Sequence, residues 1–389
     1  MQLTLLPHSE QELRMNRIRQ FMADASIDAV IIGNNANIYY LTGRIFTGYI
    51  YIPLKGMPIF FVKRPHNVEG DSVVLIRKPE DMPQSIGLNT PATLGLELDA
   101  ACYTETTRLH NIFPQATLAN ASAIMRKARA VKTPLEIEKI KTSGIKQARV
   151  YSLIPSLYAE GMRDFELQVE IEKASRLEGC LGQFRISGDS MELYMASLLV
   201  GENADIPTPY DFAMGGEGMD PSLPVGCNGT LIKPGLSVMA DVNGNYTGYM
   251  TDMTRTFKIG ELPELALKAH KCSMDICHTL EKEAKPGVEA KALYSIAEHM
   301  AEEAGLKEYF MGHKQKAGFV GHGVGIEVNE LPVLAPRSRD ILEEGNVIAI
   351  EPKFVIPHVG AVGIENTYLV TSSGLETLTT SPEEITDLL

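Results

Sequence analysis

Five residues with metal-binding side chains lie in parts of the sequence that otherwise consist of apolar strand-like runs or glycine-rich turns. They are four carboxylates and one imidazole, namely Asp241, Asp252, Glu351, Glu365 and His322. A buried carboxylate without a partner is costly or takes up a proton. A shared divalent cation removes this conflict, and carboxylates with one imidazole suit Mn, Co, Zn or Fe. Two such ions, bridged by carboxylates roughly 3.5–4 Å apart, would activate water for hydrolysis.

Each of these residues taken alone is weak evidence, and three of them have an ordinary explanation. His322 lies between two glycines and would be a turn residue, Asp252 would pair with Arg255, and Asp241 would be a turn aspartate before Val-Asn-Gly. All of these explanations would have to hold together for the metal hypothesis to be wrong. The hypothesis therefore depends on the whole group and not on any single residue.

The elements that must position these residues alternate irregularly between helices and strands. Amphipathic helices are expected over 135–158, 165–178, 265–285 and 290–304. Strand-like runs are expected over 193–200, 237–241, 246–259, 347–356 and 364–371. Because the strands and helices are not regularly interleaved, the pattern predicts an α+β domain.

The first third of the chain has a different pattern. A helix is expected over 10–25 and a buried strand over 28–32, followed by short apolar runs at 50–52, 59–62, 73–76 and 94–98. This alternation predicts a smaller α/β domain. A basic helical stretch that ends before Pro134 marks the linker, so we expect one domain over 1–127 and a second over 128–389.

The composition excludes several classes of protein. The 389 residues include 36 Lys and Arg against 49 Asp and Glu, for a net charge of −13, which argues against a nucleic-acid partner. Five scattered cysteines do not form a disulfide framework, and Cys272, Cys277 and His278 match no zinc motif. No secretory signal or membrane-spanning run is found, so a cytoplasmic protein without a membrane partner is expected.

Four short segments resemble, in order, the motifs of the creatinase/prolidase/aminopeptidase P/methionine aminopeptidase superfamily. Residues 241–257, with eleven residues from Asp241 to Asp252, are similar to its two-aspartate motif, and 321–332 to its histidine motif. Glu351-Pro352 and Ile364-Glu365-Asn366 resemble its two glutamate motifs. Two further segments, 37–43 and 128–137, resemble the prolidase-type N-terminal domain and the helix that opens the catalytic domain, so the resemblance covers nearly the whole chain.

The resemblance implies a homodimer whose C-terminal pita-bread domain follows the smaller α/β domain. It implies two divalent ions, with manganese favoured over cobalt, zinc or iron, held by Asp241, Asp252, His322, Glu351 and Glu365. In that family Asp252 and Glu365 bridge both ions, Asp241 completes one, and His322 with Glu351 completes the other. A metal-bridging hydroxide would attack the scissile carbonyl of a short Xaa-Pro peptide, with Glu351 and His322 as catalytic residues.

Several substrate-binding positions depart from the family pattern. A second histidine, seven residues after the first, is replaced by Asn329, and an upstream histidine is missing because 205–231 contains none. Gly363 stands where prolidases often have arginine, and Lys353 replaces the glycine that usually follows Glu-Pro. An amide binds a carbonyl but cannot act as an imidazolium acid. We therefore expect Asn329, His358 and Lys353 to bind substrate, although Lys353 is also interpreted as a solvated side chain.

Three functions are considered for a chain with an intact ligand set and altered substrate-binding positions. The first is an Xaa-Pro dipeptidase or aminopeptidase-like metallohydrolase that cleaves the N-terminal bond of a short peptide. The second keeps the metals but acts on a small non-peptide amide or zwitterion, like creatine or ectoine hydrolases or a lyase of the same superfamily. The third, a non-catalytic peptide-binding protein, is least favoured because all five ligands are retained. The Gly- and Pro-rich segment 201–229 is expected to form a lid or pocket wall.

Overall fold

The computed structural model describes residues 1–87, 90–188, 191 and 195–388. The contacts divide the chain into two compact units, Met1–Arg129 and Ala130–Leu389. The sequence places this boundary after residue 127. Among the described residues, no helix combines the length and apolar character needed to cross a membrane.

The first unit is built on one mixed sheet with strand order β4-β3-β2-β1-β5-β6. Its strands are β1 Ala29–Ile32, β2 Thr47–Pro53, β3 Ile59–Arg64, β4 Val73–Leu75, β5 Thr93–Leu96 and β6 Thr117–Asn120. Its helical segments are α1 His8–Asp24, α2 Asn35–Thr42, η1 Pro79–Asp81, α3 Pro83–Ile86, α4 Tyr103–Ile112 and α5 Ser122–Ala130, the last of which crosses the division between the units. β1 is fully buried in the middle of the sheet, as its continuous apolar run predicts.

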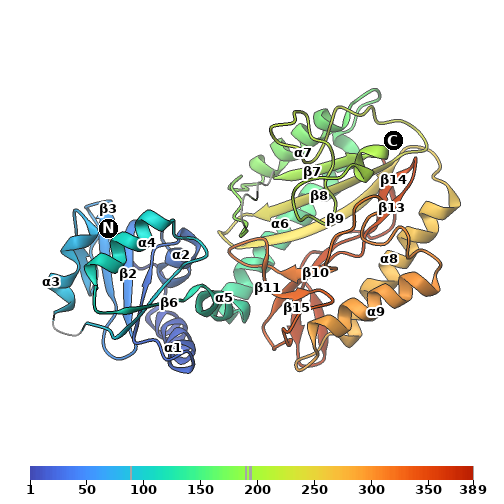
Figure 1. The fold of residues 1–389 in the computed structure, drawn as a ribbon. Coiled ribbons are helices and arrows are strands. Elements are labelled where there is room, and N and C mark those ends of the chain that lie inside the picture. The colour runs from blue at the N-terminus through green and yellow to red at the C-terminus, as the bar shows by residue number, and fades with distance from the viewer. Residues whose placement is uncertain (88–89, 189–190, 192–194, 389) are drawn as a thin grey trace. The chain divides into compact units, whose positions relative to one another are not determined.

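The second unit has two larger sheets, each covered by a pair of helices (Figure 1). One has the order β17-β9-β8-β7 and the other β11-β10-β12-β15-β16, with a small β13-β14 pair beside them. The strands of this unit are β7 Ala196–Val200, β8 Ser237–Asn245, β9 Met250–Lys258, β10 Gly321–Gly323, β11 Glu330–Leu334, β12 Val347–Ile350, β13 Phe354–Ile356, β14 Gly360–Val362, β15 Asn366–Thr371, β16 Gly374–Thr377 and β17 Thr386–Asp387. The helical segments are α6 Pro134–Leu157, α7 Asp164–Leu177, η2 Gly201–Asp205, α8 Glu264–Glu283 and α9 Ala290–Glu303.

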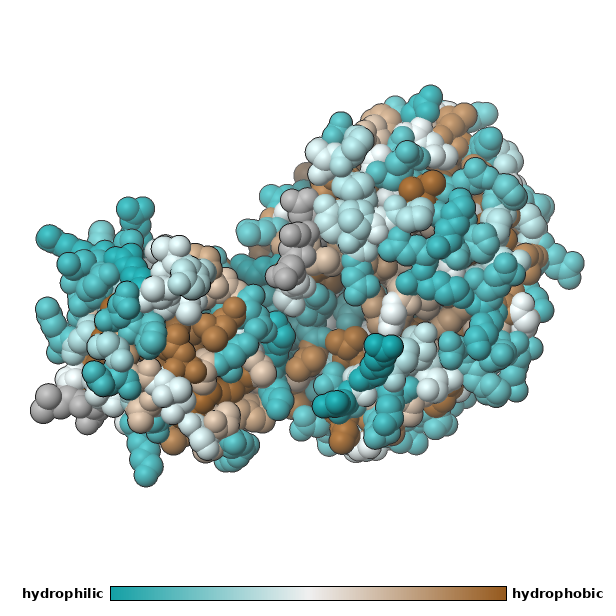
Figure 2. All heavy atoms as spheres, viewed as in Figure 1, coloured by the Kyte–Doolittle hydropathy of each residue, from teal (hydrophilic) through white to brown (hydrophobic). Residues whose placement is uncertain are grey.

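Two apolar clusters join the helix pairs to their sheets. One packs α6 and α7 against β7, β8 and β9, and the other packs α8 and α9 against the sheet that contains β10, β12 and β15. Cys272 and Cys277 are free thiols inside the second cluster, so they serve packing, as the sequence indicates. In Figure 2 the visible face of this unit is mainly hydrophilic, with hydrophobic residues scattered among the polar ones.

The expected run 347–356 is interrupted in the structure. It consists of β12 and β13, separated by Glu351-Pro352-Lys353. Pro352 has no amide hydrogen to donate to a sheet, so the strand ends before it. The expected strand over 193–200 begins at Ala196 in the structure, and its first two residues lie outside the described part of the chain.

Helix α6 fixes the position of β8 and β9. It begins in a capping box, in which the Thr133 hydroxyl accepts from the Glu136 amide at 3.3 Å and the Glu136 carboxylate accepts from the Thr133 amide at 2.9 Å. Further along, the Tyr151 hydroxyl accepts from the Val242 amide at 3.1 Å and donates to the carbonyl of Ala240 at 3.2 Å. The helix therefore holds the backbone of the strand that carries Asp241.

Gly144 of α6 lies against another part of the chain. A Cβ atom at this position would be 2.1 Å from the carbonyl oxygen of Leu378. At a solvent-exposed position inside a helix, replacement of glycine by alanine would stabilise the fold by about 1 kcal/mol. At Gly144 the same replacement should destabilise the fold, because the added Cβ overlaps backbone atoms that cannot move aside easily.

We therefore expect Gly144→Ala to lower the free energy of unfolding by about 1–3 kcal/mol. Gly318→Ala is the control, since a Cβ there meets nothing within 4 Å, and its effect should stay within about 0.5 kcal/mol. Urea denaturation of the three proteins measures both values. A Gly144→Ala variant that is as stable as the original protein would contradict this account of α6.

Candidate metal centre

The register of β8 and β9 brings the two aspartates of the candidate site together. Asn243 pairs with Asp252 and Asp241 pairs with Thr254 across the two antiparallel strands. Because alternate residues of a strand share a face, these four side chains project from the same side of the hairpin. The eleven-residue spacing thus corresponds to a hairpin in which the two aspartates are diagonal neighbours.

The second large sheet supplies the remaining three residues. His322 is the central residue of β10 and pairs with Ala349 of β12, Glu351 directly follows β12, and Glu365 directly precedes β15. Thr254 and Glu365 exchange backbone hydrogen bonds of 3.1 and 3.3 Å, which connect the two sheets at this point. The Thr254 hydroxyl also donates to Glu365 Oε2 at 2.7 Å.

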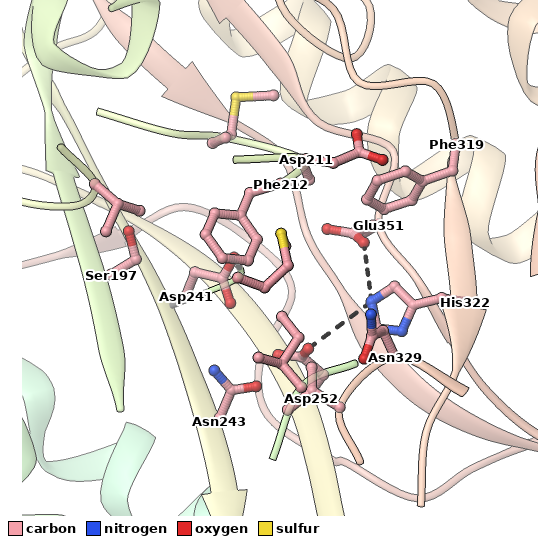
Figure 3. A pocket seen from close by; sticks show the side chains of 16 residues that line it. Ser197, Asp211, Phe212, Asp241, Asn243, Asp252, Phe319, His322, Asn329 and Glu351 are labelled. Carbon is pink, nitrogen blue, oxygen red and sulfur yellow. Dashed lines mark ion pairs between the residues drawn. The ribbon is translucent and has the colours of Figure 1, made fainter. Parts of the chain in front are cut away.

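These residues form two overlapping groups with the geometry of metal-binding sites. Asp252, His322 and Glu365 make one group, and Asp241, Glu351 and Glu365 make the other, with the ligand atoms of each within 4.8 Å of one another. Figure 3 shows Asp241 and His322 on opposite sides of the site, with Glu351 and Asp252 between them. His322 Nε2 lies 3.3 Å from Glu351 Oε1 and 4.0 Å from Asp252 Oδ2.

The orientation of His322 suits a metal ligand. Its Nδ1 lies 3.1 Å from the carbonyl oxygen of Gly323, so this nitrogen carries a hydrogen and donates it. The lone pair of the neutral ring is then on Nε2, which faces the carboxylates. A backbone carbonyl that fixes the tautomer in this way is the usual support of a metal-binding histidine.

Two oxygens of the first group have no hydrogen-bond partner although both are buried. They are Asp252 Oδ1 and Glu365 Oε1. An unsatisfied buried acceptor costs about 1–3 kcal/mol, and more when it is charged. A divalent cation ligated by Asp252, His322 and Glu365 would satisfy both oxygens, so the residues of this group fit a metal ion.

The second group is arranged differently, because the ammonium of Lys353 lies between its three carboxylates. Lys353 Nζ is 2.8 Å from Asp241 Oδ2, 2.7 Å from Glu351 Oε2 and 3.2 Å from Glu365 Oε2. The side chain is 0% exposed, so its interpretation as a solvated residue is wrong. Burial alone would lower the pKa of Lys353, but the three carboxylates raise it well above the usual range.

The remaining pKa shifts follow from burial and from this ammonium. Burial and the neighbouring carboxylates raise the pKa of Asp252 well above its usual range and that of Glu365 to about 8. Burial also acts on Glu351, yet Lys353 and His322 lower its pKa to about 2. Burial acts to lower the pKa of His322, but its hydrogen bond and charge interaction with Glu351 raise it to about 8. In the absence of a metal, the raised pKa values of Asp252, His322 and Glu365 therefore favour their protonated forms.

A cavity of about 90 Å³ opens onto these residues, several times the space that one water needs. Asp241, Asp252, His322 and Glu351 lie in its wall, and Figure 3 shows the sixteen lining side chains. The segment 201–229 contributes Asp211, Phe212, Ala213, Met214 and Val225, and the wall is completed by Ile186, Met191, Ser197, Asn243, Phe319, Val328 and Asn329. No lysine or arginine occurs among these described lining residues.

The three residues expected to bind substrate have different environments. Asn329 lines the cavity, but its amide is held by the backbone of Ser187, accepting at 2.8 Å and donating at 2.7 Å. Lys353 lies beneath the carboxylates and is not one of the described lining residues. His358 is 86% exposed, forms an ion pair with Glu202, and is likewise absent from the described wall.

Several important residues had no clear signal in the sequence. Arg255, considered above as a partner of Asp252, instead donates to the backbone oxygens of Glu365 and Thr254, each at 2.8 Å. Lys132 forms a buried ion pair of 3.1 Å with Glu330. Thr254 could have been found from its position two residues after Asp252, on the same strand face. Loop residues such as Phe212 have no periodicity that would reveal them.

The pKa shifts predict how metal binding depends on pH. In chelator-treated protein, His322 and Glu365 hold protons below about pH 8 and must release them to bind a cation. The affinity for Mn²⁺ should therefore rise between pH 6 and 8, by up to about tenfold per pH unit for each proton, and level off above. Calorimetric titration in buffers of different ionisation enthalpy measures the affinity and the protons released. A constant affinity with no proton release would contradict this assignment.

Two protein-family models match this chain and together cover most of it. Residues 138–372 match the model of metallopeptidase family M24, and residues 14–131 match the creatinase/prolidase N-terminal domain. The Xaa-Pro dipeptidase of Pyrococcus horikoshii is 28% identical over 380 residues, which cover 96% of this chain and 98% of that protein. The Xaa-Pro dipeptidase of Pyrococcus furiosus is also 28% identical, over 387 residues that cover 96% and 99% of the two chains.

Comparison of structures leads to the same family. The crystal structure of the prolidase from Pyrococcus horikoshii OT3 matches with a TM-score of 0.78 and 26% identity, over 96% of this chain and 99% of that one. The predicted α+β fold, with a pita-bread domain behind a smaller α/β domain, is confirmed. Since the M24 model covers more than half of the sequence, the chain belongs to metallopeptidase family M24 and carries a creatinase/prolidase N-terminal domain ahead of the catalytic unit.

Proposed function

We propose that this protein is a metal-dependent hydrolase that cleaves the N-terminal bond of short Xaa-Pro peptides. The observation that carries the proposal is the buried group of Asp252, His322 and Glu365, in which two carboxylate oxygens have no hydrogen-bond partner. The relatives named Xaa-Pro dipeptidase, which match over nearly their full length, support the same reaction class.

A divalent cation bound there would lower the pKa of a water and polarise the scissile carbonyl. Around it, the protein's own groups handle protons. Glu351 lines the cavity, and Lys353 and His322 lower its pKa to about 2, so it is ionised at neutral pH. A carboxylate this acidic is a weak base, so it would hold a proton from the attacking water only briefly before passing it to the more basic leaving amine. The hydrogen bond from Nδ1 to Gly323 holds His322 with Nε2 directed at the carboxylates of Asp252 and Glu351.

The cavity wall indicates how a peptide would bind. Phe212, Phe319, Met214 and Val328 provide apolar surface for a proline ring or another small side chain. The described wall offers no lysine or arginine to pair with a free C-terminal carboxylate. A peptide whose C-terminal charge is removed should therefore bind at least as well as the free acid.

This idea is tested with matched pairs of Xaa-Pro dipeptides, one with a free carboxylate and the other as the C-terminal amide. We expect kcat/KM for the amides to equal or exceed that for the acids, because the wall would have to desolvate a carboxylate without a cationic partner. Release of the free N-terminal amino acid from Mn²⁺-loaded protein gives both values. Strong preference for the free acids would contradict this view of the cavity.

The metal requirement is tested by Asp252→Asn, which keeps the side-chain shape but removes the charge. Both Mn²⁺ affinity and peptidase activity should fall by more than about 100-fold, beyond the loss typical of residues that only support a ligand. Asp275→Asn on α8, whose side chain is 46% exposed, is the control and should leave both unchanged. Activity that survives in the Asp252 variant without bound metal would overturn the proposal.

A second candidate is favoured by one feature of the cavity. Asp211 and the rings of Phe212 and Phe319 line the same wall, a combination that attracts a positively charged group. A small non-peptide amide or zwitterion with a cationic nitrogen would fit this chemistry. Thermal-shift screening of betaine-like and amide metabolites, with Phe212→Leu as the comparison, tests it. If no compound stabilises the protein, this candidate is rejected.

The other expectations remain predictions. They concern the homodimer, the cytoplasmic location and manganese as the preferred ion. Metal analysis of the purified protein identifies the ion.

A further inference from the structure

Lys353 occupies the position where a second cation would be ligated. The three oxygens nearest to its ammonium belong to Asp241, Glu351 and Glu365, at 2.8, 2.7 and 3.2 Å. These are the same three residues whose ligand atoms form the second metal-like group. A metal bound by these oxygens would lie about 2.0–2.2 Å from each, in the space that the ammonium fills.

The ammonium also satisfies the chemical requirements of this position. It has three N–H donors, and each finds one carboxylate oxygen. Because the side chain is 0% exposed, it cannot exchange these contacts for water without a rearrangement of the site. A second divalent cation would have to displace a buried positive charge from its three acceptors, which is strongly unfavourable.

The backbone around Lys353 is adapted to this arrangement. Gly363 has φ of +140°, and a Cβ atom there would lie 2.9 Å from the Pro352 carbonyl oxygen and 3.1 Å from Lys353 Cα. A larger side chain at position 363 would therefore clash with the backbone of Pro352 and Lys353, which positions the ammonium. Lys353 and Gly363 both depart from the prolidase pattern, and the structure shows that they are neighbours.

The first group contrasts with the second. Glu365 Oε2 accepts hydrogen bonds from the Lys353 ammonium and the Thr254 hydroxyl. In contrast, Glu365 Oε1 and Asp252 Oδ1 have no hydrogen-bond partner. His322 Nε2 lies on the same side, 4.0 Å from Asp252 Oδ2. In the second group the Lys353 ammonium thus supplies positive charge to the carboxylates, whereas the first group has two carboxylate oxygens that a cation would satisfy.

We propose that Lys353 replaces one of the two metal ions, so that the protein binds a single divalent cation through Asp252, His322 and Glu365 beside a fixed ammonium. The inference rests on the metal site of the proposed function but not on its peptide substrate. It changes the number of ions from the two that the family resemblance implies to one.

The test is to count the ions. Protein treated with chelator is reloaded with excess Mn²⁺, freed of unbound metal, and measured by elemental analysis and electron paramagnetic resonance. The original protein should hold one ion per chain, with the spectrum of an isolated Mn²⁺. Lys353→Ala, which removes the ammonium and leaves its three carboxylates, should hold two ions per chain, with the spectrum of two interacting ions.

Lys141→Ala is the control for loss of a lysine. Its ammonium forms a partly exposed ion pair of 2.9 Å with Glu376, so this variant should hold one ion. If Lys353→Ala folds only when Mn²⁺ is present, two ions per chain in that folded protein support the inference equally. Two ions in the original protein, or one ion in folded Lys353→Ala at saturating Mn²⁺, would overturn it.

Failure of this inference and failure of the proposed function give different results. One ion per chain together with no cleavage of any Xaa-Pro peptide would reject the peptidase and leave the role of Lys353 intact. Two ions per chain with peptide cleavage would reject the role of Lys353 and leave the peptidase intact. No bound ion in the original protein would reject both.

Discussion

Negative charge buried between two sheets is the constraint on which the rest of the catalytic unit depends. Asp241, Asp252, Glu351 and Glu365 converge where the sheets meet, and three of them are almost completely buried. Carboxylates in such a place repel one another and lose their hydration, so they need positive charge or protons nearby. Lys353 provides part of this charge, and its removal would leave three acceptors uncompensated.

The surrounding architecture holds these charges at short range. The β8–β9 register aligns the aspartates, and the backbone pair between Thr254 and Glu365 joins their sheet to the one that carries His322. Helix α6 supports the hairpin through Tyr151, and its Gly144 lies close to Leu378, directly after β16 of the other sheet. Helices on the outer faces of the sheets therefore serve the site indirectly, by preventing the strands from separating under the repulsion of the carboxylates.

Chemistry and specificity come from different parts of the unit. The charged residues lie on or next to strands, where the register determines their spacing. Apart from the charged residues, the described cavity wall comes largely from the segment 201–229 and other loops. These loops supply its apolar side chains together with Asp211 and Asn329, whereas Ser197 and Asn243 project from strands. Membership of family M24 thus accounts for the metal-binding half of the site, while the substrate depends on loop residues that vary independently of the fold.

The sequence by itself determined the order of the elements, the α+β class and the five charged residues, because strand periodicity and the Asp241–Asp252 spacing are local properties. It also showed that Lys353, Gly363 and Asn329 are unusual. Only the tertiary structure decided what they contact, since a lysine after Glu-Pro has the same local sequence whether its ammonium lies in solvent or beside three carboxylates. Asp241 is 112 residues from Lys353 along the chain and meets it only when the two sheets pack. The charge balance of the site is a property of that packing, and no local pattern contains it.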